Sequence, residues 1–199
     1  MDRKIFSKIE ICYDPAKLSA ESGILEGTKE YGELMMALAL AERCVRPRAV
    51  IRRCSIAEKD CGLLVAGKSP ESGELTEMLR PLTRCGEIVL GIITAGDEID
   101  YVGAITSEKI FWTLKSATLR GAENAICDFL RREWNYLHPR WLRPGIPDKI
   151  PVRENRFLFR TIGNVFDDIG VELSDSGFMS PEFTVSVIFF DGGTDAKQN

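Results

Sequence analysis

Residues 168–190 read DIGVELSDSGFMSPEFTVSVIFF and contain a helix end and two strand candidates. Gly170 stands where a helix commonly ends with a glycine in the left-handed conformation. Residues 171–173 and 183–190 are rich in β-branched and aromatic side chains, which favours strands. This stretch therefore predicts a helix end followed by two strands.

A second strand candidate lies upstream, in residues 87–94 (EIVLGIIT). A nearly continuous apolar run is typical of a strand that is buried on both faces, so we expect a central strand here. The turn that follows carries Thr94, Gly96 and Asp97. Two interpretations are open: Thr94, Gly96, Asp97 and Glu98 line a cleft at the strand end, or Gly96 permits the turn while Asp97 caps the next helix.

The remaining chain mixes helices and strands without a regular β-α-β rhythm or an internal repeat. Apolar residues at helical spacing predict helices in residues 22–44, 101–119, 121–136 and 154–169, with Gly121 as a break between the second and the third. Strands are expected in residues 4–13, 48–56 and 62–66. Four prolines predict an irregular loop over residues 137–151. The fold class is α+β, with a curved, mainly antiparallel sheet and packed helices.

The composition and charge of the chain exclude some classes of function. The chain has 199 residues, 44% of them hydrophobic, which is enough for one core or two closely packed lobes. A net charge of -4 argues against a nucleic-acid partner. We expect no membrane span and no signal peptide, and hence a cytoplasmic protein, because no apolar run approaches about 20 residues.

The sequence predicts no metal site and no self-contained catalytic group. Its six cysteines include no Cys-x-x-Cys pair, and His138 is the only histidine. Zinc and iron–sulfur sites usually need clustered ligands. We therefore expect the cysteines to be reduced and mostly buried as small apolar residues.

Three stretches together resemble the C-terminal activation domain of cobalamin-dependent methionine synthase. The family shows a Gly-hydrophobic-x-Leu-Thr/Ser pattern, then a Met, a Pro and a strand. The matching residues, in order, are Gly170, Leu173, Ser174, Met179, Pro181, Val185 and Ser186. Residues 92–99 (IITAGDEI) resemble a turn of free-standing relatives, and the segment Gly121-Ala122-Glu123 with residues 142–151 resembles the family's Ala-Glu helix and Pro-Gly ligand loop. The resemblance divides the chain into residues 1–86, which we expect to belong to the same domain, an activation-domain-like core in residues 87–192, and a polar tail in residues 193–199.

The resemblance implies a site for S-adenosylmethionine, but this chain departs from the family's residues there. Gly145 matches the loop glycine, whereas Trp141 stands at the family's Arg position and Ile146 at its Tyr position. Arg140 or Arg143 can supply the guanidinium to the ligand carboxylate instead, or both are solvated surface residues. The candidate ligand-binding residues are Glu123, Arg140, Trp141, Arg143, Pro144 and Gly145, with Thr94, Gly96 and Met179 as a possible cleft. Glu123, at the family's helix glutamate, either meets the ligand ammonium or is solvated.

The function that the resemblance implies is support of corrinoid methyl transfer. The chain would bind S-adenosylmethionine and/or dock on a corrinoid protein or corrinoid methyltransferase, with a reductase as a further partner, and support methylation or reactivation of cobalt. Cobalamin would belong to the partner, since the Asp-x-His-x-x-Gly signature is absent. The alternatives are a non-catalytic scaffold that has lost the S-adenosylmethionine site, which Trp141 and Ile146 favour, and an unrelated small-molecule-binding protein.

Overall fold

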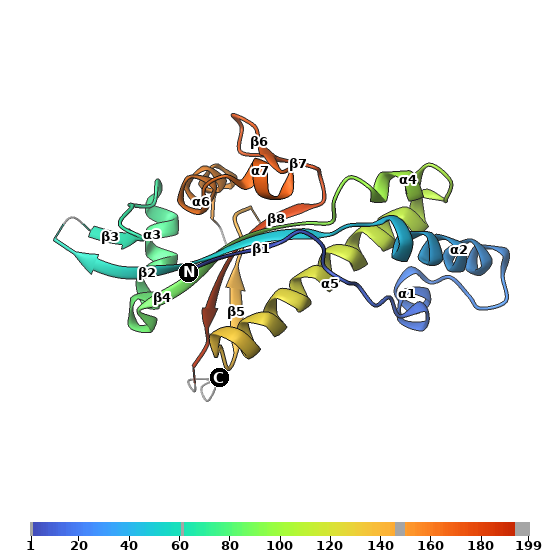
Figure 1. Ribbon diagram of the computed structural model, residues 1–199, viewed down its shortest axis with the longest axis horizontal. Helices are drawn as coiled ribbons and strands as arrows, with labels where there is room; N and C mark the ends of the chain where they lie inside the picture. Colours follow the sequence, from blue (N-terminus) through green and yellow to red (C-terminus); the bar gives the residue numbers. More distant parts are fainter. Residues whose placement is uncertain (1, 61, 146–149, 194–199) are drawn as a thin grey trace.

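A mainly antiparallel sheet forms the centre of the molecule in the computed structural model, which describes residues 2–60, 62–145 and 150–193 (Figure 1). Its strands, in spatial order, are β1 (Arg3–Phe6), β2 (Arg48–Lys59), β4 (Glu87–Thr94), β8 (Thr184–Asp191) and β5 (Pro139–Leu142). Each neighbouring pair is antiparallel. Strand β3 (Gly62–Val65) extends the sheet by pairing with the end of β2, and β6 (Glu172–Leu173) pairs separately with β7 (Met179–Ser180). The α+β class with a mainly antiparallel sheet is confirmed.

The predicted central strand is β4, with the bounds expected from its apolar run. It lies between β2 and β8, and every residue after Glu87 is buried. Alternate side chains of a strand point to opposite faces. Leu90 and Ile92 therefore pack on one side of the sheet, and Val89 and Ile93 on the other.

Helices cover both faces of the sheet. The face of Leu90 packs against Leu75 and Phe157 from α3 (Gly73–Leu79) and α6 (Asn155–Ile162), together with α7 (Val165–Ile169) and the 3-10 turn η1 (Arg80–Cys85). A second 3-10 turn, η2 (Val152–Glu154), leads directly into α6. The face of Val89 packs against Ile126 and other residues of the long helix α5 (Glu108–Trp134). In Figure 1, α6 and α7 lie above the sheet and α5 crosses below it.

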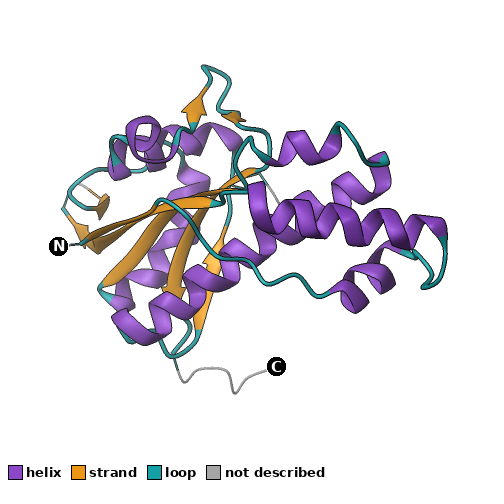
Figure 2. Cartoon of the chain, turned by 45° about the vertical axis from the view of Figure 1, so that its right-hand side comes forward, coloured by secondary structure: helices purple, strands orange, loops and turns teal. Residues whose placement is uncertain are grey.

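A third cluster lies beyond the end of the sheet and is mainly helical. It is formed by α1 (Pro15–Ser22), α2 (Lys29–Cys44), α4 (Ile99–Gly103) and the first half of α5. Figure 2 shows these helices grouped on one side of the strands. None of the helices in the described parts of the chain is long and apolar enough to cross a membrane.

Two helix predictions were wrong at glycines. Helix α5 runs through Gly121 without a break. The glycine gives room for Ile11 instead, since a Cβ at Gly121 would lie 2.9 Å from Ile11 Cγ2. The helix predicted over residues 22–44 begins only at Lys29, where Thr28 caps α2, and α1 before it, which Gly23 ends in the left-handed conformation, was not predicted.

Three other bounds differ from the expectation. The predicted irregular loop over residues 137–151 contains strand β5, which tolerates Pro139 because it begins an edge strand. The predicted helix over residues 154–169 divides into α6 and α7 at Gly163 and Asn164, both with positive φ. The predicted strand over residues 4–13 is limited to β1.

Segments before and after residue 87 share one core, since Val50 and Leu75 pack in the same cluster as Leu90 and Phe157. The division at residue 87 itself stays a prediction. Ile146, Cys61 and residues 194–199 of the predicted tail lie outside the described residues.

Candidate functional site

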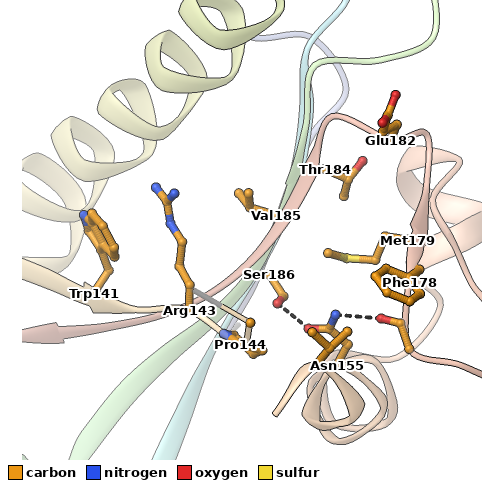
Figure 3. A pocket seen from close by; sticks show the side chains of 13 residues that line it. Trp141, Arg143, Pro144, Asn155, Phe178, Met179, Glu182, Thr184, Val185 and Ser186 are labelled. Atoms are coloured by element: carbon orange, nitrogen blue, oxygen red, sulfur yellow. Dashed lines mark hydrogen bonds between the residues drawn. The ribbon is translucent and has the colours of Figure 1, made fainter. Parts of the chain in front are cut away.

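A cavity of about 570 Å³ opens where the end of β5, the start of β8 and the start of α6 meet (Figure 3). Its volume lies within the range of small-molecule sites. The lining residues are Trp141, Arg143, Pro144, Gly145, Val152, Asn155, Gly177, Phe178, Met179, Glu182, Thr184, Val185 and Ser186. Five of the nine candidate site residues are therefore brought together here: Trp141, Arg143, Pro144, Gly145 and Met179.

The first wall of the cavity is the segment after β5. Trp141, Arg143, Pro144 and Gly145 all line it. Gly145 has a φ of +93°, and its N–H donates to the carbonyl of Ile150 at 2.8 Å. This conformation strongly favours glycine.

Arg143 is not a solvated surface residue. Its guanidinium lies over the Trp141 ring, with Cζ 4.1 Å from the ring centroid, and forms an ion pair with Glu123. The two charged side chains are only 26% and 16% exposed. Burial raises the pKa of Glu123, against the opposing effects of Arg143 and Arg120. Glu123 therefore contacts a cavity residue without lining the cavity itself.

The floor of the cavity depends on Asn155, which sequence reasoning missed. Its side chain is almost completely buried at the start of α6. Asn155 Nδ2 donates to the carbonyl of Gly177 at 2.8 Å, and its Oδ1 accepts from the Ser186 hydroxyl. Because buried amides need partners, this pair of bonds ties the 177–179 segment to β8. An asparagine next to the predicted helix start at residue 154 was the signal available in the sequence.

The opposite side of the cavity carries Phe178, Met179 and Glu182 (Figure 3). Met179 therefore faces the same cavity as the ligand loop. Glu182 is exposed and lies across the cavity from Arg143 in Figure 3. The cavity thus has a cation on one side and an anion on the other.

The other cleft candidates lie behind or outside this cavity. Thr94 is fully buried, and its hydroxyl oxygen accepts from Thr184 Oγ1 at 2.8 Å and from the Gly96 N–H at 3.1 Å. It supports Thr184, which lines the cavity. Gly96 makes the turn with a φ of +84°, as one interpretation proposed. The capping role of Asp97 was wrong, since its carboxylate binds Arg48 at 3.1 Å and α4 has no side-chain cap.

Arg140, the other candidate arginine, is exposed on β5 and does not line the cavity.

Within residues 2–60, 62–145 and 150–193, no group of three or more His, Cys, Asp or Glu side chains is placed to hold a metal ion.

Comparison with known proteins shows a likeness in structure. No protein-family model and no curated protein matches the sequence. A solved structure described as the MetH reactivation domain bound to AdoHcy superposes with a TM-score of 0.57. The match covers 95% of this chain and 78% of that chain, at 14% sequence identity. The chain therefore has the mixed α+β fold of the MetH reactivation domain.

Proposed function

We propose that the cavity binds S-adenosylmethionine or S-adenosylhomocysteine, and that the chain docks on a corrinoid protein to support methyl transfer to its cobalt or reactivation of that cobalt. The observation that carries the proposal is the convergence of Trp141, Arg143, Pro144, Gly145 and Met179 on one cavity. The solved domain with the same fold is bound to AdoHcy, which supports the choice of ligand.

The lining side chains suit the groups of such a ligand. The Arg143 guanidinium matches the ligand carboxylate, because its planar fork pairs with carboxylates. Glu182, across the cavity, suits the ammonium or the sulfonium. Trp141 and Phe178, which are 42% and 66% exposed, offer ring surface to the adenine.

The reaction makes few demands on this chain. Cobalamin, which the partner would carry, would supply a cobalt nucleophile for the methyl group. The chain's own residues then need to align the ligand and exclude water, and no acid or base is required. A cavity lined mainly by apolar side chains and a few polar groups fits that task.

Isothermal titration calorimetry of the Arg143→Ala variant tests the site. We expect saturable binding of both ligands to the wild type. In the variant, the binding free energy should weaken by about 1.5 to 3 kcal/mol, the scale of a hydrogen bond to a charged group. This equals a roughly 10- to 150-fold higher Kd. Arg140→Ala is the matched control in the same segment and should bind as the wild type does. Absence of saturable binding to the wild type contradicts the proposal.

A scaffold that has lost the ligand site is the second candidate. It is favoured by the contacts of Arg143 with Trp141 and Glu123, because a guanidinium that already has these partners is less available to a ligand. Under this function the wild type binds neither ligand but still captures a purified corrinoid protein in a pull-down.

A further inference from the structure

Glu123 and Arg143 come from different elements and meet at the edge of the cavity. Glu123 lies in the middle of α5, and Arg143 follows β5. Of these two residues, only Arg143 lines the cavity, so the carboxylate of Glu123 approaches the guanidinium from outside the cavity. In Figure 3, Arg143 stands beside Trp141 with its guanidinium held away from the cavity floor.

A ligand carboxylate on Arg143 would be the second anion at one guanidinium. Two carboxylates that share a site repel each other, and one of them then tends to take up a proton. The repulsion is strong here because both protein side chains are largely buried, where charges are less screened than in water.

We propose that Glu123 is a positioning residue that competes with the ligand for Arg143. In the empty site it holds the guanidinium over Trp141. When the ligand carboxylate arrives, Glu123 takes up one proton from solvent and gives up its ion pair. The proposal rests on the ligand site proposed above, and it replaces contact between Glu123 and the ligand ammonium.

The charged and titratable groups around Glu123 agree with this role. Arg143 and Arg120 face it as cations, and Arg120 is shared with Glu21 at 2.6 Å. Cys127, one turn further along α5, interacts electrostatically with Glu123, and burial raises the pKa of its thiol, which stays neutral. Burial also raises the pKa of Glu123.

The affinity for the ligand should depend on pH. The pKa of Glu123 is raised in the free protein, and an anion bound nearby raises it further. Binding therefore takes up protons at pH values between these two pKa values. Affinity rises as the pH falls through that window, by at most about tenfold per pH unit, because one proton is coupled.

The test is calorimetric titration of S-adenosylhomocysteine in two buffers of different ionisation enthalpy, between about pH 5.5 and 7, below the range in which an α-amino group titrates. We expect proton uptake by the wild type. Glu123→Gln should abolish the uptake and tighten binding at pH 7 by about tenfold, the effect of one unit of pKa coupling. Methylthioadenosine, which lacks the carboxylate, should bind without proton uptake.

Glu133→Gln, an exposed position near the end of the same helix, is the matched control and should behave as the wild type. The buffer comparison on the wild type needs no variant, so the proposal does not depend on how Glu123→Gln folds. Binding without proton uptake, or weaker binding by Glu123→Gln, overturns the proposal and leaves the ligand site standing. Absence of binding at every pH overturns the ligand site itself, and this proposal with it.

Discussion

Cys12 and Cys54 are thiols in opposite surroundings. Cys54 is 2% exposed in the core on β2, whereas Cys12 is exposed. Of the five described cysteines only Cys54 is fully buried, so the expectation that most of them are buried was wrong. Burial raises the pKa of Cys54 to about 11, because the charged thiolate is poorly solvated there.

The two thiols should therefore differ in reactivity. Iodoacetamide at pH 8 should alkylate Cys12 and leave Cys54 unmodified, since the thiolate is the nucleophile and Cys54 is both protonated and covered. Peptide mass spectrometry measures the two sites separately. Denaturant is the control and should make Cys54 react. Equal labelling of both residues in the native protein would contradict the burial of Cys54.

At the scale of single residues, the sequence identified candidate residues of the cavity but not the residues that they contact. Trp141, Arg143 and Gly145 were predictable because they stand close together in one stretch of sequence, which resembles a known ligand loop. Glu123 precedes Arg143 by 20 positions, and Asn155 precedes Ser186 by 31. Such contacts depend on how the elements pack, and one sequence carries no record of that.

At the scale of elements, Gly32 and Gly121 are helix glycines with different neighbours. A Cβ at Gly32 in α2 would meet nothing within 4 Å, whereas a Cβ at Gly121 in α5 would press on Ile11. Helix propensity alone rewards an alanine at either position by about 1 kcal/mol. The space around each glycine therefore decides whether an alanine there raises or lowers the free energy of unfolding.

We expect Gly32→Ala to raise the free energy of unfolding by about 0.5 to 1 kcal/mol. Gly121→Ala should lower it, because overpacking costs about 1 to 3 kcal/mol. Urea denaturation followed by circular dichroism measures both variants, each serving as the other's control. A gain of equal size in the two variants would show that Ile11 does not need the space.

Strands β4 and β5 show why some elements could be predicted and others not. In β4 the local apolar pattern and the buried position agree, so its bounds were correct. In β5 the local signal is a proline-rich loop, and the strand exists because β8 offers a free edge. Pairing with a distant strand overrode the local preference there.

At the scale of the whole molecule, helix α5 belongs to two cores. Ile110 and Leu114 pack in the helical cluster, and Ile126 and Leu130 pack against the sheet. One continuous helix therefore links the helical group to the sheet. This link was not predicted, because the sequence favoured a break at Gly121.

The shared helix predicts cooperative unfolding. Leu34→Ala in the helical cluster and Leu90→Ala in the sheet, both at fully buried positions, should each cost about 2 to 5 kcal/mol. Each variant should shift one common transition in urea, with coincident curves from circular dichroism and tryptophan fluorescence. Two separate transitions in Leu34→Ala would show that the helical group unfolds independently.

Strand β5 also affects how the protein can change over time. Among the described strands it pairs with β8 alone, at the margin of the sheet, yet it leads into the wall that carries Arg143. Substitutions or insertions there disturb one ladder of hydrogen bonds and leave the interior strands intact. The cavity wall can therefore vary in evolution with little effect on the central strands that hold the sheet together.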